Sequence, residues 1–87
     1  MNFFYTHKAA KQLELLPPAI QKRIIEKMRF YADQSDPLKF AKKLIDSREG
    51  EFRFRIGDYR AIFTPTREGF LILRIAHRRE VYRKGRP

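Results

Sequence analysis

The pattern of apolar positions predicts two helices in the first third of the chain. Residues 7–16 carry an apolar stripe at helical spacing, formed by Ala9, Leu13 and Leu16. Residues 18–34 carry a second stripe, formed by Ile20, Ile24, Met28 and Tyr31. Thr6 is a suitable N-cap for the first helix, and the prolines at 17–18 end it and can open the second. We therefore expect two antiparallel helices that cover a common apolar surface.

The second half of the chain changes to a strand pattern. Residues 51–56 alternate between polar and apolar positions, which predicts a strand with one buried face. Gly57 and Asp58 suit a two-residue hairpin turn, so residues 59–64 are expected to return as a second strand. Residues 70–77 are mostly apolar, which is typical of a central strand or of one buried on both sides.

Two further segments complete the predicted organisation. Residues 2–5 form a short first strand. Residues 38–49 connect the second helix to the hairpin and are anchored by apolar positions at helical spacing, namely Leu38, Ala41 and Leu44. No repeat, low-complexity tract or linker interrupts the sequence, so residues 1–87 are expected to fold as one α+β domain.

The hairpin turn predicts which side chains share a face of the sheet. Residues paired across two strands point to the same side, so Arg55 lies opposite Arg60, and Arg53 lies on the same face. The opposite face is apolar and should meet the helices; it holds Phe52, Phe54, Ile56, Tyr59, Ala61 and Phe63. The predicted sheet thus has one apolar and one arginine-rich face.

Two arginines placed directly opposite each other repel unless an anion neutralises them. The planar guanidinium group makes paired hydrogen bonds to phosphate, whereas lysine acts as a point charge. The arginine-rich face therefore favours phosphate binding. The alternative is a solvated strand face whose arginine stems cover apolar surface.

Net charge points in the same direction. Twenty Lys and Arg residues against ten Asp and Glu residues give a charge of +10, and such self-repulsion is normally tolerated when the partner is an anion. Nucleic acid is the leading candidate, and an acidic protein is the second. Membrane ranks third, because no helix combines a cationic face with a strongly apolar one. A basic protein that is merely soluble is the remaining alternative.

Composition excludes several kinds of site. The chain has no cysteine, so disulfides, thiolate metal ligands and a thiol nucleophile are ruled out. Its four glycines form no phosphate loop and its two histidines form no zinc signature, so we expect no cofactor or metal. The N-terminus lacks the apolar stretch of a signal peptide, and the apolar run of residues 70–76 is far below the roughly 20 residues that span a bilayer. We therefore expect a cytoplasmic protein.

A second basic constellation follows the last strand, at residues 77–83. Arg74 and Arg78 share parity along this strand and could join the arginine-rich face. Tyr82 lies among clustered arginines, where a tyrosine can stack on a base or take part in proton transfer. The alternative for Tyr82 is a terminal aromatic packed on the core.

Residues 52–63, FRFRIGDYRAIF, and residues 75–83, IAHRREVYR, resemble the RelE branch of the RelE/ParE toxin superfamily. The helical segment at residues 9–24 resembles it as well, so the likeness covers nearly the whole chain. The resemblance implies two N-terminal helices packed on one face of an antiparallel sheet of about four strands, like a small microbial ribonuclease. It also implies a toxin that cuts mRNA in the ribosomal A site, by helping the ribose 2′-hydroxyl attack the adjacent phosphate.

The resemblance also implies roles for individual residues. The family's catalytic positions fall on Arg53, Arg55, Arg60, Arg78 and Tyr82. Further contacts to RNA are expected from Arg74, Arg79, Arg83 and Lys84. Some RelE members have lysine at the first two positions, and lysine can lose its proton whereas arginine effectively cannot. The general base therefore stays open among Tyr82, His77 and Glu80.

The resemblance further implies partners. They are a cognate acidic antitoxin, the mRNA and ribosome, and operator DNA through the antitoxin complex. Two other functions remain open: a ParE-like inhibitor of DNA gyrase without nuclease activity, and a non-catalytic module that only binds an antitoxin.

Overall fold

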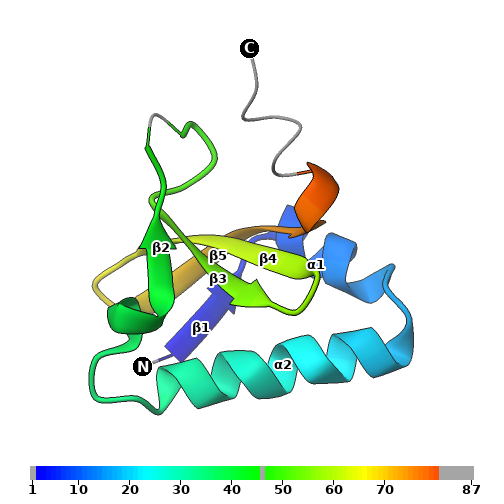
Figure 1. Ribbon diagram of the computed structural model, residues 1–87, viewed down its shortest axis with the longest axis horizontal. Coiled ribbons are helices and arrows are strands. Elements are labelled where there is room, and N and C mark those ends of the chain that lie inside the picture. Colours follow the sequence, from blue (N-terminus) through cyan, green and yellow to red (C-terminus); the bar gives the residue numbers. More distant parts are fainter. Residues whose placement is uncertain (1, 46, 81–87) are drawn as a thin grey trace.

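The computed structural model of the protein describes residues 2–45 and 47–80. The order of elements is β1 (Asn2–Tyr5), α1 (His7–Glu14), α2 (Pro18–Ala32), a short 3-10 helix η1 (Pro37–Phe40), β2 (Ala41–Lys43), β3 (Phe52–Ile56), β4 (Tyr59–Pro65) and β5 (Gly69–His77). Figure 1 shows α2 along one side of a twisted sheet, with the β2–β3 loop and the turn after β5 on the other side. The strand, two helices and hairpin predicted from the sequence are confirmed.

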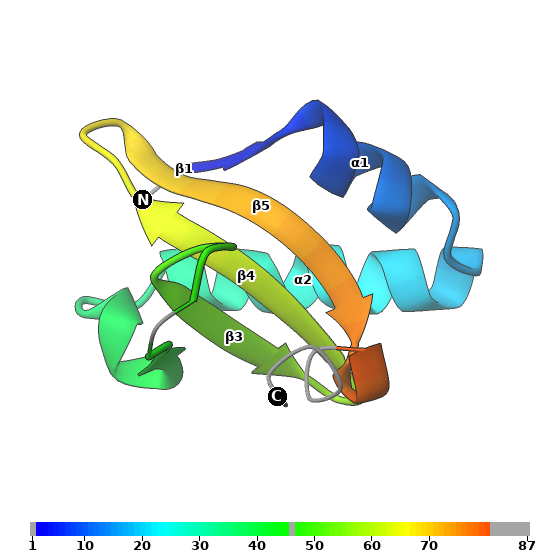
Figure 2. The same cartoon turned by 90° about the horizontal axis from the view of Figure 1, so that it is seen from above.

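The sheet has five strands in the order β1-β5-β4-β3-β2. Three neighbouring pairs are antiparallel, and β1 runs parallel to β5 with Phe3 opposite Phe70. Figure 2, viewed from above, shows β5 between β1 and β4. The expectation of about four antiparallel strands is therefore corrected on two points: the sheet contains β2, and its β1 edge is parallel.

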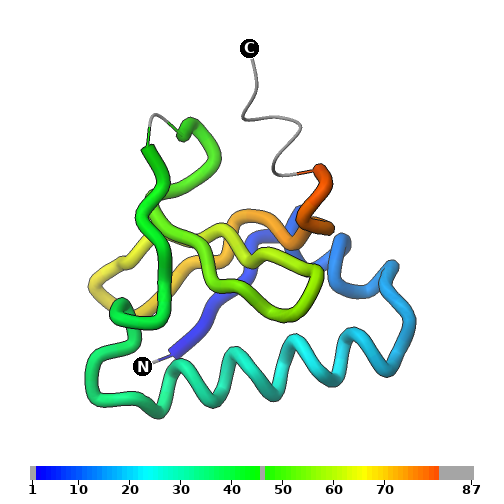
Figure 3. Tube along the Cα trace, in the orientation of Figure 1, coloured from blue at the N-terminus to red at the C-terminus, as the bar shows by residue number. Residues whose placement is uncertain are grey.

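The additional strand lies in the segment expected to be an anchored connector. Residues 37–40 form the 3-10 helix, and residues 41–43 then extend beside β3, with Lys42 opposite Arg53. The helical spacing of apolar residues in this segment was misleading, because the backbone groups on the outer edge of β3 need hydrogen-bond partners and an extended chain supplies them. Figure 3 traces the chain from α2 through this segment into the loop above the sheet.

Aromatic rings form the centre of the core between sheet and helices. Phe54 stacks on Phe63 with centroids 4.4 Å apart, and Tyr31 of α2 stacks on Phe54 at the same separation. Phe54, Phe63 and Phe70 have no exposed surface. Burial of each such side chain stabilises the fold by about 1.5–3 kcal/mol. The apolar face of the hairpin therefore meets the helices, as predicted.

Both helices end slightly before their predicted limits. Helix α1 ends at Glu14 and α2 at Ala32, where the sequence pattern predicted 16 and 34. A residue that precedes proline is disfavoured in helical conformation, which explains why Leu16, before Pro17, lies outside α1. At the start of α1, Thr6 accepts a hydrogen bond from Ala9 N at 3.1 Å, which confirms it as the N-cap. No helix in the described part of the chain is long and apolar enough to cross a membrane.

Candidate nucleic-acid interface

The register of the sheet gathers basic side chains on the side opposite the helices, called the outer face below. Across the hairpin, Arg55 pairs with Arg60 and Arg53 with Ile62, as predicted. The neighbouring strands extend the row, because Lys42 of β2 pairs with Arg53 and Arg74 of β5 pairs with Ile62. We define the outer face by its basic residues Lys42, Arg53, Arg55, Arg60 and Arg74.

The three arginines of the hairpin differ in how far their side chains are buried. Arg55 is exposed and Arg53 is half-buried. Arg60 is only 1% exposed, and its Nη1 donates to the carbonyl oxygens of Gly57 at 3.0 Å and Tyr59 at 2.9 Å. The guanidinium of Arg60 therefore lies against the backbone of the hairpin turn.

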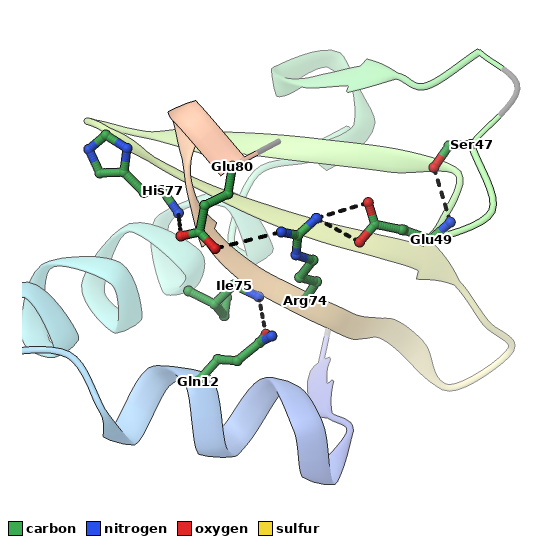
Figure 4. Close-up of polar contacts among 7 residues, drawn as sticks. All are labelled: Gln12, Ser47, Glu49, Arg74, Ile75, His77 and Glu80. Carbon is green, nitrogen blue, oxygen red and sulfur yellow. Dashed lines mark hydrogen bonds and ion pairs between the residues drawn. The ribbon is translucent and has the colours of Figure 1, made fainter. Parts of the chain in front are cut away.

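Arg74 lies on the outer face, but its charge is already paired. Its Nη1 lies 2.9 Å from Oε1 and 2.7 Å from Oε2 of Glu49, and its Nη2 lies 3.8 Å from Oε2 of Glu80. Figure 4 shows the guanidinium between the two carboxylates. Its side chain is 7% exposed. Arg74 thus lies on the outer face as its parity along β5 predicted, whereas its two carboxylate partners have no signal in the sequence pattern.

The turn after β5 is tied to the hairpin. The Arg78 backbone N donates to Asp58 O at 2.7 Å, and its Nε lies 3.8 Å from Asp58 Oδ1. The Arg78 side chain is about half exposed, and Figure 2 shows the turn of residues 78–80 beside the tip of the hairpin. Arg79 is exposed as well. Arg78 therefore lies near the same end of the sheet as Arg55 and Arg60.

The candidate bases are divided between the two sides of this turn. The ring of His77 packs edge-on against Tyr59, whose side chain lies on the helix side of the sheet, with centroids 5.5 Å apart. Figure 4 shows the imidazole turned away from Arg74, whereas the carboxylate of Glu80 points toward it. Tyr82, Arg83 and Lys84 fall outside the described residues. Among the described candidates, Glu80 is thus the one on the outer-face side.

The β2–β3 loop covers the apolar part of the outer face. A Cβ atom at Gly50 would lie 2.8 Å from Ile62 Cγ2 and 3.1 Å from Leu73 Cδ1, so only glycine lets the loop approach this closely. Glu49, in the same loop, reaches Arg74 from this position. The loop contact lies at Ile62 and Leu73, and Arg55, at the other end of the outer face, is exposed.

Sequence reasoning missed two residues of this site, Lys42 and Glu49. Lys42 could have been found only if the segment had been recognised as a strand, and Glu49 lies 25 positions from Arg74 in the sequence. Within the described residues, no group of three or more His, Asp or Glu side chains could hold a metal ion. Burial raises the pKa values of the Tyr5 and Tyr31 hydroxyls, whose rings pack on the helix side of the sheet.

The fold and the family comparison together define the class of protein. The chain belongs to the ParE toxin family of type II toxin–antitoxin systems (parDE), whose model matches residues 3–82. It is therefore a toxin of a toxin–antitoxin system, within the RelE/ParE superfamily that the motifs of residues 52–63 and 75–83 indicated.

Individual relatives agree with this assignment. Toxin RelG of Mycobacterium tuberculosis is 33% identical over 82 residues, which cover 92% of this chain and 93% of RelG. The toxin–antitoxin complex RelBE2 from Mycobacterium tuberculosis contains a chain with a TM-score of 0.72 and 31% identity, covering 87% of this chain and 95% of that one. A chain of the RelB–RelE antitoxin–toxin complex from Methanococcus jannaschii matches with a TM-score of 0.68 and 20% identity, covering 93% of this chain and 96% of that one. This second structure supports the fold alone.

Proposed function

We propose that this toxin is an endoribonuclease that cleaves mRNA in the ribosomal A site. The observation that carries the proposal is the exposed Arg55 on the sheet face that the helices leave open, with the buried Arg60 paired with it across the hairpin and held by the turn carbonyls. Arg53 of β3 and Lys42 of β2 extend the same row of positive charge. Such a row matches the phosphates of a single RNA strand.

The chemistry is attack of the ribose 2′-hydroxyl on the adjacent phosphate, which leaves a 2′,3′-cyclic phosphate and a free 5′-hydroxyl. The attack builds negative charge on the phosphorus-bound oxygens, and preorganised guanidinium groups stabilise that charge more than they stabilise the ground state. Arg53 and Arg55 position and neutralise the phosphate. Arg60 supports them from its fixed place at the turn, and Arg78 faces the phosphate or the leaving 5′-oxygen.

A base must accept the proton of the 2′-hydroxyl. Tyr82 is our first candidate by resemblance, and Glu80 is supported by its place on the outer-face side of the last turn. His77 is less suited, because its ring packs against Tyr59. Substitution of Tyr82 by Phe and of Glu80 by Gln, followed by a pH–rate profile of cleavage, distinguishes them: only loss of the true base removes the rise of the rate with pH.

Further contacts to RNA are assigned to cations near the C-terminus, namely Arg79, which is exposed, and Arg83 and Lys84, which lie outside the described residues. The partner that controls the toxin is an acidic antitoxin, and the pair binds operator DNA through the antitoxin. Support comes from the charge of +10 and from the related RelBE2 chain, whose structure is that of a toxin–antitoxin complex.

Expression in bacteria tests the proposal. Primer extension on a translated message should reveal cuts at A-site codons soon after induction, together with growth arrest. Growth arrest with intact mRNA and gyrase-linked DNA breaks would instead identify a ParE-like gyrase inhibitor, the second candidate that the parDE family description favours. Harmless expression with tight antitoxin binding would identify a non-catalytic module.

A further inference from the structure

Arg74 connects β5 with the β2–β3 loop and with the turn that follows β5. It lies on β5, its Nη1 is held by Glu49 from the β2–β3 loop, and its Nη2 faces Glu80 from the turn after β5. The two nitrogens of the guanidinium fork serve different carboxylates, which a lysine ammonium on one flexible stem cannot reproduce. The arrangement is thus a bridge rather than a simple ion pair (Figure 4).

Two hydrogen bonds within residues 77–80 hold the turn that follows β5. His77 Nδ1 accepts a hydrogen bond from Arg79 N at 3.2 Å, and Glu80 Oε1 accepts one from His77 N at 3.3 Å. This reciprocal pattern resembles a capping box, with histidine in place of serine or threonine and with the N–H two positions on, rather than three, as the donor to its side chain. Glu80 therefore has two roles at once: one oxygen caps the turn and the other faces Arg74.

We infer that Arg74 is a positioning residue for RNA cleavage, which acts through Glu80 to hold the turn that presents Arg78 beside the hairpin. The inference rests on the proposed function. Direct contact of Arg74 with RNA is disfavoured, because its side chain is 7% exposed and two carboxylates surround its single positive charge. A purely stabilising role is also a poor explanation, since buried ion pairs are often no better for stability than apolar residues of similar size.

The bridge also fixes where Arg78 sits. The backbone N of Arg78 donates to Asp58 O, which attaches one end of the turn to the hairpin. Glu80 attaches the other end to Arg74. Loss of the second attachment leaves Arg78 free to rotate about the first. A displacement of about 1 Å in a catalytic group can lower the rate by roughly a hundredfold.

Cleavage kinetics with purified toxin and message-programmed ribosomes test the inference. Arg74→Lys, Arg74→Met and Glu80→Gln should each lower kcat by roughly tenfold to a hundredfold, while KM changes less than about twofold because the hairpin arginines are untouched. All three should keep the rise of the rate with pH, whereas a profile that only Glu80→Gln flattens would make Glu80 the general base and overturn its positioning role. Arg74→Lys keeps the charge and loses the bridge, so it should resemble Glu80→Gln. Arg67→Met, in the exposed β4–β5 turn, is the matched control and should cleave like the wild type.

Coupling supplies the sharper criterion. The double variant Arg74→Met with Glu80→Gln should be no slower than the slower single variant, because both remove the same attachment. Multiplicative losses in the double variant would overturn the inference, and so would a rise in KM with unchanged kcat for Arg74→Met. Arg74→Lys, which keeps the charge and loses the bridge to Glu80, provides the same comparison with Glu80→Gln if Arg74→Met fails to fold.

A readout that does not need catalysis separates this inference from the proposed function. Amide hydrogen exchange of His77 and Arg78, whose N–H groups bond to Glu80 and Asp58, should accelerate at least fivefold in Arg74→Lys and not in Arg67→Met. Unchanged exchange would overturn the bridge even in an active toxin. Faster exchange in a protein that never cuts RNA would support the bridge and contradict the nuclease.

Discussion

At the scale of single residues, identical side chains on one sheet face have different environments. Arg55 is exposed, Arg60 is buried against two turn carbonyls, and Arg74 is enclosed by carboxylates. The register of the hairpin could be predicted because it depends on neighbours in the sequence. The environment of Arg74 could not, because Glu49 arrives from a loop whose path depends on the whole fold.

Tyr31 provides a test of how the helix layer is attached to the hairpin. Its hydroxyl donates to the backbone oxygen of Arg55 at 2.9 Å while its ring stacks on Phe54. Tyr31→Phe keeps the ring and removes the hydrogen bond, so it should lower the free energy of unfolding by about 1 kcal/mol in urea denaturation at neutral pH. A loss no larger than that of Tyr59→Phe would contradict the importance of this bond.

The same tyrosine and Tyr5 predict how stability depends on pH. Burial raises both pKa values above the ordinary 10.0, so the unfolded chain releases these protons before the folded protein does. Stability due to the neutral hydroxyls is complete below pH 10 and is lost as pH rises from there through the folded-state pKa values. The slope is at most about 1.4 kcal/mol per pH unit for each tyrosine.

Urea midpoints measured between pH 8 and pH 11 check this dependence. The double variant Tyr5→Phe with Tyr31→Phe should show a flatter decline above pH 10 than the wild type. Equal slopes would mean that neither hydroxyl titrates differently in the folded state.

At the scale of elements, local sequence patterns predicted the helices and the hairpin, whereas pairings between distant strands were not predicted. The hairpin was predictable because its alternation and its two-residue turn lie within residues 51–64. The parallel contact of β1 with β5 was not predictable, because most of the chain separates the two strands. Strand β2 was not, because a strand of three residues carries little periodic signal.

Gly69 tests the parallel edge. Its φ is +152°, and a Cβ atom there would lie 2.3 Å from the backbone oxygen of Asn2. Gly69→Ala should therefore push β1 away from β5 and cost more than about 2 kcal/mol of unfolding free energy. Gly57→Ala is the comparison, since its φ is +58° but open space surrounds the site; about 1–2 kcal/mol is expected there. Equal costs would contradict the tight approach of β1.

At the scale of the whole molecule, the sheet separates two functions of the chain. One side holds the aromatic core and both helices, and the other carries Lys42 and the arginines of the hairpin. The candidate site was predictable as far as it lies on the hairpin. Its limits, set by the β2–β3 loop and the last turn, depend on tertiary contacts that no local pattern reveals.

The net charge of +10 predicts salt-dependent binding to RNA. For single strands, each phosphate contact contributes about −0.7 to the slope of log K against log salt. Replacement of Arg53 and Arg55 by Gln should therefore make the slope shallower by about 1.4. Fluorescence anisotropy with a short oligoribonucleotide at several salt concentrations measures both slopes, and an unchanged slope would place the RNA elsewhere.

The most direct test of the outer face as the cleaving surface is a single-turnover assay with purified toxin and programmed ribosomes. The wild type should cut the message at the A site, and Arg53→Gln with Arg55→Gln should lower the rate at least a hundredfold while both proteins unfold at similar urea concentrations. Lys22→Gln with Arg23→Gln removes the same charge from the exposed side of α2 and should leave the rate nearly unchanged. Equal rates for the two double variants, or no A-site cut by the wild type, would contradict the account.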